Sequence, residues 1–218
     1  MKKRILFVTT NFSKINENIK TGVWFEEFAV PFLVFEKTGY ELVVASPLGG
    51  NSPIDVNSLS CSNPMEWDEA AKFLRNTVEL SKVDYKMFDA IYLPGGHAPM
   101  FDLANSEMLK KIIEFFYEND KVISAVCHGV AGLVLAKDKN GYSIVRNKNV
   151  TSFTNKEEQI VKMVEFMPFL LESRLKFLGC NFVAEKPWSE HVEICGNLIT
   201  GQNQNSALLL AESVISVL

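Results

Sequence analysis

The chain has 218 residues, a formal net charge of −4, a hydrophobic fraction of 47% and a charged fraction of 22%. These values are typical of a globular protein with a sizeable buried core, so we expect residues 1–218 to form a single domain. The longest basic run is Lys2-Lys3-Arg4, which argues against nucleic acid and anionic membranes as partners. No stretch approaches the roughly 20 apolar residues of a membrane span, and no signal peptide is apparent, so we expect a cytoplasmic protein.

Apolar runs of strand length alternate with segments of helical spacing along the chain. Strands are expected at 5–10, 41–46, 90–93, 122–126, 150–153, 181–184 and 192–195, with a turn at 196–197 leading into 198–199. Helices are expected at 23–37, 67–80, 107–117, 130–136, 157–178 (interrupted at Pro168) and 206–218. This alternation predicts an α/β fold in which a mostly parallel sheet is covered by helices on both faces.

The predicted helix over 23–37 carries two neighbouring acids, Glu26 and Glu27. At about 100° per residue, Glu27 lies on the flank of the apolar face, whereas Glu26 points away from it. An acid on such a flank is usually an edge residue that reaches water. If the flank meets the carboxyl ends of the strands, burial raises its pKa and makes it a proton shuttle. The spacing therefore favours Glu27 over Glu26 as a site residue.

A glycine pair follows the predicted strand at 90–93, in the sequence Pro94-Gly95-Gly96-His97. Paired glycines often do no more than turn the chain. Beside a nucleophile at the neighbouring strand end, the N–H groups of Gly95 and Gly96 could stabilise an oxyanion. We expect the N–H of His128 to be the other donor. His97 is either a solvated residue or part of this substrate-binding loop.

The segment KVISAVCHG at 121–129 places Cys127 between a predicted strand and a predicted helix. The small Ala125 two residues before the cysteine, and Gly129 two residues after it, fit the crowding of a nucleophile elbow. A helix N-terminus favours a thiolate, so we expect the pKa of Cys127 to lie below its usual range. The alternative is a buried, inert cysteine at the end of a core strand. The combination of small residue, Cys127, His128 and Gly129 favours the nucleophile.

His128 is adjacent to Cys127, and a carboxylate that orients it would complete a Cys-His-acid arrangement. Glu157 and Glu158 follow the predicted strand at 150–153 and precede a helix. From the local pattern alone, they are interpreted as helix N-terminal acids that complement the macrodipole.

The other cysteines, Cys61, Cys180 and Cys195, are far apart and form no Cys-x-x-Cys pair. We therefore expect neither a zinc site nor a disulfide framework, and we interpret all three as packing residues. A reducing compartment fits this pattern. His191 and Glu193 match the His-x-Glu pair of class I glutamine amidotransferases, but they lie one strand too early for that triad. We therefore reject a glutaminase triad.

An ordered series of motifs runs through nearly the whole chain. The motifs are TGVWFEE at 21–27 with Pro31, Ala45-Ser46-Pro47 with Gly49-Gly50, PID at 53–55, LPGGH at 93–97, AVCHG at 125–129, VTSFT at 150–154 with Glu157-Glu158, PFLLE at 168–172 and LITGQN at 198–203. Together they resemble the ThiJ/PfpI superfamily, which has a class I glutamine amidotransferase-like fold. Within it, the chain is most similar to the branch of stress chaperones and glutathione-independent glyoxalases (glyoxalase III).

The resemblance implies a flavodoxin-like α/β/α sandwich and a homodimer. It also implies a Cys-His-Glu site, with Cys127 as the nucleophile, His128 as its partner and Glu158 at the third position. The family's acid beside the thiol corresponds to Glu27, in agreement with the helix-face argument. Departures from the family pattern at Ala98, Val130, Ser152 and Gln204-Asn205 bear on substrate preference more than on the chemistry.

The function implied by the resemblance is that of a glyoxalase, a lyase that converts methylglyoxal or a related 2-oxoaldehyde to a 2-hydroxy acid such as D-lactate. A hemithioacetal on Cys127 would be the first intermediate, and the chemistry requires no metal and no cofactor. Two alternatives use the same chain differently. One is a holdase-type chaperone that captures unfolded client proteins on apolar surface. The other is a cysteine peptidase or amidase, in which Cys127 attacks an acyl group.

Overall fold

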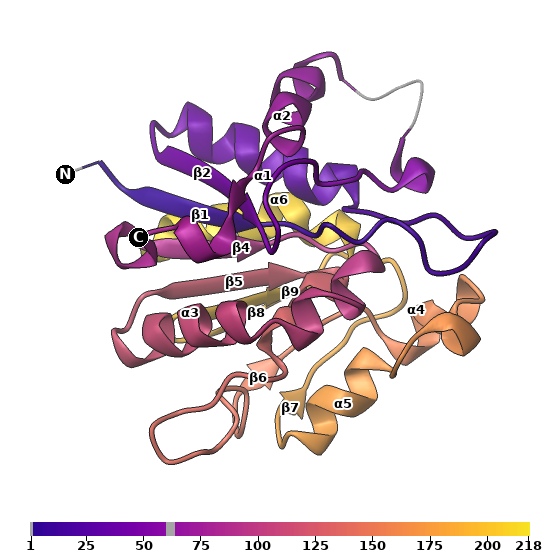
Figure 1. The fold of residues 1–218 in the computed structure, drawn as a ribbon. Helices are drawn as coiled ribbons and strands as arrows, with labels where there is room; N and C mark the ends of the chain where they lie inside the picture. Colours follow the sequence, from indigo (N-terminus) through magenta and orange to yellow (C-terminus); the bar gives the residue numbers. More distant parts are fainter. Residues whose placement is uncertain (1, 60–63) are drawn as a thin grey trace.

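In the computed structural model, which describes residues 2–59 and 64–218, seven strands form one sheet in the order β3-β2-β1-β4-β5-β9-β8 (Figure 1). They are β1 (Arg4–Val8), β2 (Glu41–Ser46), β3 (Val78–Glu79), β4 (Ala90–Leu93), β5 (Val122–Val126), β8 (Val192–Cys195) and β9 (Leu198–Gly201). Each neighbouring pair is parallel except β8 and β9. The predicted mostly parallel sheet is confirmed.

Helices cover both faces of the sheet because successive side chains of each strand point to opposite faces. In β1, Phe7 packs against phenylalanines of α1 (Phe25–Lys37), with ring centroids 5.4 Å from Phe28 and 5.8 Å from Phe32. Helix α6 (Ala207–Val217) contributes to the same core. On the other face, Leu6 packs in a core shared with α3 (Glu107–Glu118). Figure 1 shows α1 and α6 on one side of the sheet and α3 on the other, which confirms the α/β/α sandwich.

The remaining elements flank this sandwich. They are α2 (Glu66–Leu74), α4 (Asn155–Ile160), α5 (Leu171–Phe177) and a separate two-stranded sheet of β6 (Asn149–Val150) and β7 (Asn181–Phe182). Figure 1 shows α4, α5, β6 and β7 together at one side of the molecule. Among the helices described, none is long and apolar enough to cross a bilayer.

Several predicted elements differ from the structure. The helix expected over 67–80 ends at Leu74, because the next residues cross to β2 and form β3, where Val78 pairs with Ala45. The strand expected at 150–153 is shortened to β6 and pairs with β7 rather than with the main sheet. The helix expected over 157–178 divides into α4 and α5, and Lys162, just after α4, has a left-handed backbone (φ 58°) that cannot continue a helix.

The segment after β5 is a 3₁₀ helix, η6 (Cys127–Leu133), rather than the α-helix expected over 130–136. It begins directly at the cysteine and passes very close to β4. A Cβ atom added to Gly129 would lie 2.2 Å from the carbonyl oxygen of Leu93, so only glycine fits at this position. This close approach fixes the height of Cys127 above the end of the sheet.

Candidate active site

Cys127 lies at the carboxyl end of β5, at the apex of a sharp strand-to-helix turn. Its backbone is left-handed, with φ 56°, although Val126 before it is extended. A non-glycine residue in this region costs about 1–3 kcal/mol, which the surrounding structure must offset. The side chain is only 5% exposed. This geometry is that of a nucleophile elbow, as the sequence pattern predicts.

Helix α1 delivers Glu27 to the sulfur of Cys127. The carboxyl group is fully buried and lies beside the Cys127 side chain. Its Oε2 accepts a hydrogen bond of 2.7 Å from the N–H of Gly95. Burial raises the pKa of Glu27 to about 8, although the hydrogen bond from Gly95 and the neighbouring Cys127 thiol oppose the shift. Glu26 is half-buried and does not line the Cys127 cavity, whereas Glu27 does, so the predicted preference for Glu27 agrees with the placement of the two residues.

The expected low pKa of the Cys127 thiol is wrong for the protein without substrate. Burial raises the pKa of Cys127, and a carboxylate at Glu27 raises it further. The N–H groups of His128 and Gly96 act in the opposite direction, as the elbow predicts, but they do not outweigh these effects. The buried thiol is therefore the resting form, and its proton needs an acceptor when it reacts.

His128 supplies that acceptor. Its Nδ1 lies 3.4 Å from the sulfur of Cys127, and its Nε2 lies 2.7 Å from Oε2 of Glu158. Burial, together with the neighbouring His97, lowers the pKa of His128, so the imidazole is neutral near pH 7. An ionised Glu158 can only accept a hydrogen bond, which assigns the proton to Nε2 and leaves the lone pair of Nδ1 facing the thiol.

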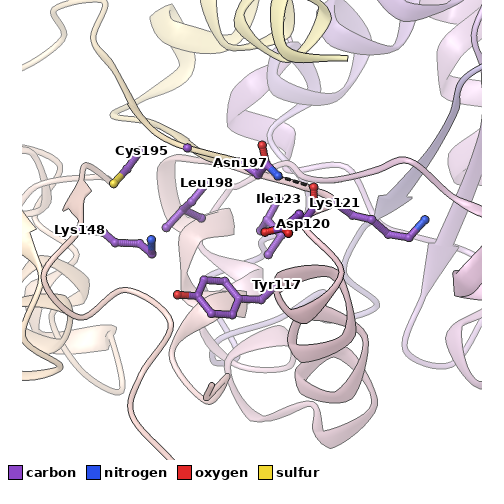
Figure 2. A pocket seen from close by; sticks show the side chains of 9 residues that line it. Tyr117, Asp120, Lys121, Ile123, Lys148, Cys195, Asn197 and Leu198 are labelled. Carbon is purple, nitrogen blue, oxygen red and sulfur yellow. Dashed lines mark hydrogen bonds between the residues drawn. The ribbon is translucent and has the colours of Figure 1, made fainter. Parts of the chain in front are cut away.

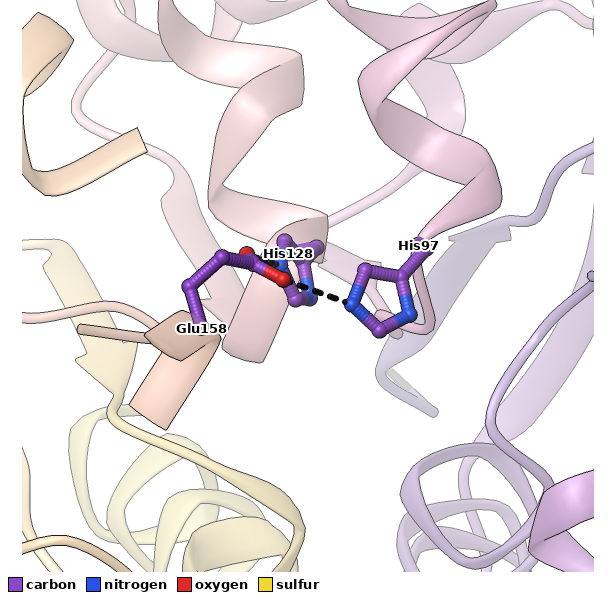
Figure 3. A group of neighbouring side chains, drawn as sticks. All are labelled: His97, His128 and Glu158. Atoms are coloured by element: carbon purple, nitrogen blue, oxygen red, sulfur yellow. Dashed lines mark hydrogen bonds and ion pairs between the residues drawn. The ribbon is translucent and has the colours of Figure 1, made fainter. Parts of the chain in front are cut away.

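Glu158 is shared by two histidines. Its Oε1 lies 2.9 Å from Nε2 of His97, and its other oxygen binds His128 (Figure 3). Burial alone would raise the pKa of Glu158, but attraction to His128 and hydrogen bonds from both imidazoles lower it to about 2. His97 therefore contacts the site acid directly, which the position of His97 in the glycine loop did not reveal.

The two adjacent acids Glu157 and Glu158 have different surroundings. Oε2 of Glu157 accepts hydrogen bonds from the N–H and the hydroxyl of Thr154. The Thr154 hydroxyl in turn accepts from the N–H of Glu157, which completes a capping box at the start of α4. Its Oε1 accepts from the N–H of Trp188 and from the amides of Gln202 and Asn203. The interpretation of both acids as helix N-terminal residues is thus correct for Glu157 and incomplete for Glu158. The Thr154-x-x-Glu157 spacing is a sequence signal that identifies the cap.

The backbone N–H groups of the glycine loop, Gly95 and Gly96, differ in what they contact. The N–H of Gly95 donates to Glu27 and is not free for an oxyanion. The N–H groups of Gly96 and His128 both point at the sulfur of Cys127. Gly96 is left-handed (φ 95°), and a Cβ atom there would lie 2.3 Å from the carbonyl oxygen of Gly22. Of the three N–H groups expected to stabilise an oxyanion, those of Gly96 and His128 therefore lie beside the sulfur, whereas that of Gly95 does not.

Cys127 opens into a cavity of about 90 Å³. Its walls are formed by Trp24, Glu27, Gly96, His97, Cys127, His128, Phe153, Val161, Trp188 and Gln204. A second cavity of about 310 Å³ also contacts Trp24, His97 and Val161, so the two share one wall. These apolar walls were not predicted from the sequence, because Trp188 comes from the distant segment between β7 and β8 and no local pattern marks it.

The other candidate residues lie elsewhere. Cys195 lines a cavity of about 450 Å³ together with Lys121 and Ile123 (Figure 2). Those two residues lie around the start of β5, whereas Cys127 follows its end. Cys180 and Cys195 are free thiols, whereas Cys61 lies outside the described residues. His191 lies 3.1 Å from Glu193 on β8, and neither residue lines the Cys127 cavity. The rejected glutaminase triad therefore has no support in the geometry.

The fold and this site define an α/β/α protein with a cysteine nucleophile elbow. The sequence model described as the DJ-1/PfpI family matches residues 18–217, and the chain belongs to this family. The "Glyoxalase 3" of Candida albicans is 29% identical and covers 98% of this chain and 97% of its own. The "Glutathione-independent glyoxalase hsp3101" of Schizosaccharomyces pombe is 31% identical and covers 92% of this chain and 89% of its own.

Solved structures agree with this assignment. The X-ray structure of Francisella tularensis Rapid Encystment Protein 24 KDa is 34% identical, covers 99% of this chain and 98% of its own, and superposes with a TM-score of 0.94. The crystal structure of glyoxalase III from Candida albicans is 28% identical, covers 99% and 97%, and gives a TM-score of 0.91. The resemblance seen in the sequence motifs is therefore confirmed.

Glu27→Gln is expected to stabilise the fold, increasingly so at higher pH. An unfolded chain releases the Glu27 proton near pH 4.5, whereas the folded chain retains it up to about pH 8. Between these values the carboxyl progressively favours the unfolded state, by several kcal/mol in total. Urea unfolding of wild type and Glu27→Gln at pH 5, 6.5 and 8 measures the difference. A difference that stays constant with pH would contradict the raised pKa.

Glu157→Gln and Glu158→Gln are expected to differ in their effect on activity. Glu158→Gln removes the charge that orients His128, so kcat should fall by about 10²-fold. It should also lower stability at neutral pH, because the lowered pKa of Glu158 means that its ionised carboxylate favours the folded state. Glu157→Gln weakens the contacts to Thr154 and Trp188, so the midpoint of thermal unfolding should fall with little loss of kcat. Steady-state kinetics and thermal melts of both variants, side by side, distinguish the two roles. An equal fall in kcat in both variants would contradict them.

Proposed function

We propose that this chain is a glutathione-independent glyoxalase that converts methylglyoxal, or a closely related 2-oxoaldehyde, to a 2-hydroxy acid, D-lactate in the case of methylglyoxal. The observation that carries this proposal is that two acid–base groups, Glu27 and His128, contact the same buried sulfur. An isomerisation by way of a thioester needs both. One group has to handle the thiol proton, and the other a carbon-bound proton. The names of the Candida and fission-yeast relatives support the same activity.

The first step is addition of Cys127 to the aldehyde carbon. Nδ1 of His128 takes the thiol proton and passes it to the aldehyde oxygen, which gives a neutral hemithioacetal. While charge develops on that oxygen, the N–H groups of Gly96 and His128 lie beside the sulfur to which the carbon is bound. Glu158 keeps the His128 ring in the required tautomer through the 2.7 Å hydrogen bond.

The second step moves a proton between two carbons. The Glu27 carboxylate removes the hydrogen from the carbon that carries the sulfur and returns a proton to the neighbouring carbon, by way of an enediol. In the same step His128 transfers the hydroxyl proton of the former aldehyde oxygen to the former ketone oxygen. The former aldehyde carbon is thereby oxidised to a thioester while the ketone carbon is reduced to an alcohol, so no external oxidant is consumed. Water then hydrolyses the thioester, releasing the 2-hydroxy acid and the Cys127 thiol. A pKa of about 8 suits Glu27 for this exchange.

The size of the cavity supports a small substrate over the two alternatives. A volume of about 90 Å³ between Trp24 and Trp188 accommodates a three-carbon aldehyde but not an extended peptide, which weighs against a peptidase. Leu48, Met65 and Phe177 are large exposed apolar side chains that lie on three separate segments of the chain. Exposed apolar residues are ordinary on protein surfaces and do not by themselves favour a holdase.

We also infer that residues 1–218 form one domain, since the sheet includes strands from both ends of the chain and α6 packs against α1. Dimerisation is inferred from the family resemblance. A cytoplasmic location fits the free thiols of Cys180 and Cys195.

The function is tested by incubating the purified protein with methylglyoxal in the absence of glutathione and measuring D-lactate with a stereospecific dehydrogenase. We expect one D-lactate for each methylglyoxal consumed. Formation of L-lactate, or loss of methylglyoxal without lactate through simple adduct formation, would contradict the proposal.

A further inference from the structure

Three possible metal ligands converge beside the nucleophile. Nε2 of His97 lies 2.9 Å from one oxygen of Glu158, Nε2 of His128 lies 2.7 Å from the other, and the ligand atoms all lie within 4.8 Å of one another. Figure 3 shows both imidazole rings turned toward the same carboxylate. The three side chains come from the loop after β4, from η6 and from α4, so the fold brings them together from distant parts of the sequence.

The donor set selects the kind of cation. Two imidazole nitrogens and one carboxylate oxygen suit Zn²⁺ and related borderline cations, whereas Mg²⁺ and Ca²⁺ prefer oxygen ligands. Zinc binds nitrogen at about 2.0–2.1 Å and oxygen at about 2.0–2.2 Å, so neighbouring ligands of a tetrahedral ion lie about 3.3 Å apart. The observed contacts of 2.7 Å and 2.9 Å go to different oxygens of Glu158, and the ligand atoms, one from each residue, lie within 4.8 Å of one another. Bringing them to the spacing of a tetrahedral ion therefore takes side-chain shifts of about 1.5 Å or less.

We propose that His97, His128 and Glu158 form a reversible inhibitory Zn²⁺ site. The metal takes the place of the protons that Glu158 shares with the two imidazoles, and its fourth position faces the cavity, where a water completes the tetrahedron. Binding moves each of those protons to the other nitrogen of its imidazole ring, so both rings stay neutral. The inhibition, although not the binding, rests on the proposed function.

Inhibition follows from which nitrogen the metal occupies. A zinc ion on Nε2 of His128 requires the remaining ring proton to sit on Nδ1, the atom 3.4 Å from the sulfur of Cys127. Metal-bound imidazoles commonly donate that second N–H to an acceptor, and here the acceptor is the sulfur. His128 then has no lone pair to take the thiol proton, so the first step of the reaction stops. Because the sulfur faces Nδ1, Cys127 is not itself a ligand.

Because Cys127 is not a ligand, zinc binding can be tested in a variant that lacks the thiol and has no turnover. In a Cys127→Ala background, Zn²⁺ binding is measured by competition with a chromophoric zinc indicator. We expect one high-affinity zinc per chain in Cys127→Ala, and at least about a 10-fold weaker affinity when His97→Asn is added. His191 is the third and last histidine of the chain, so Cys127→Ala with His191→Asn is the matched control and should bind as Cys127→Ala does. Circular dichroism and a thermal melt verify the fold of each variant.

The binding measurements can overturn the proposed zinc site. Absence of zinc binding in Cys127→Ala, or equal affinity with and without His97→Asn, overturns the site. If His97→Asn fails to fold, His97→Gln replaces it, and X-ray absorption of the zinc complex of Cys127→Ala should show two imidazole nitrogens; one or none overturns the site.

The turnover measurement separates the metal site from the proposed function. With methylglyoxal as substrate, Zn²⁺ should inhibit the wild-type protein and EDTA should restore it. Inhibition of His97→Asn at the same zinc concentration as wild type would indicate thiol capture and overturn the mechanism. If the protein binds zinc as expected but forms no lactate, the metal site is supported and the proposed glyoxalase function is refuted.

Discussion

Cys127→Ala is expected to reduce D-lactate formation from methylglyoxal to the level of buffer alone. Without the sulfur there is no hemithioacetal and no thioester, and the acid–base groups Glu27 and His128 have no covalent intermediate on which to act. Loss of a nucleophile of this kind reduces kcat by on the order of 10⁴-fold or more. Cys195→Ala, at the opposite end of β5, is the matched control and should retain wild-type turnover.

The same variant separates the alternatives. If the protein acts as a holdase through apolar surface, suppression of client aggregation should persist in Cys127→Ala, since the removed group is only 5% exposed. Residual lactate formation by Cys127→Ala above the buffer level would contradict the covalent mechanism, whatever the outcome of the aggregation assay.

Glu27→Gln is expected to lower kcat for methylglyoxal by about 10²–10⁴-fold while the protein stays folded. An amide can still accept the N–H of Gly95, but it cannot remove the hydrogen from the sulfur-bearing carbon. Glu26→Gln, one residue earlier on α1, should be nearly silent because its carboxyl group is only half-buried and makes no described contact with the thiol. Equal losses in both variants would mean that Glu27 acts only by packing.

The pH profile adds a second readout for Glu27. The carboxylate is the active form, so kcat of wild type should rise as pH increases toward the raised pKa of about 8 and then level off. The apparent value belongs to the coupled pair of Glu27 and Cys127 rather than to either group alone. In Glu27→Gln the residual activity should lack this rise. A wild-type profile that is flat between pH 6 and pH 8 would contradict the assignment of Glu27 as the base.

Most strands of the sheet could be predicted because hydrophobic runs in the local sequence determine where each strand begins and ends. The bounds of β2, β4, β5 and β8 agree with the predicted runs to the residue. The prediction failed at Val78–Glu79, where a two-residue strand depends on pairing with β2, and at 150–153, where the partner is β7 rather than the main sheet. Both errors concern which strand pairs with which, and a local sequence pattern does not carry that information.

The site shows the same division between local and distant information. Helix periodicity favoured Glu27 over Glu26 because the face on which a residue lies depends only on α1. The elbow around Cys127 could be predicted because it depends only on the turn after β5. The pKa of Cys127 was predicted in the wrong direction because it depends on burial by residues from distant segments, such as Trp188. The contact of His97 with Glu158 joins residues 61 positions apart and needed the fold to be seen.

The buried acid beside a strained cysteine has a consequence for protein engineering. The wild-type chain places an acid of raised pKa and a left-handed cysteine at one point of its core, and both features oppose folding. Substitutions that relieve them are among the easiest gains in stability that the sequence offers. A directed-evolution campaign that screens only for heat resistance would therefore select substitutions at positions 27 and 127 early, and the catalytic groups would be lost first. A screen of this family needs an activity filter in every round.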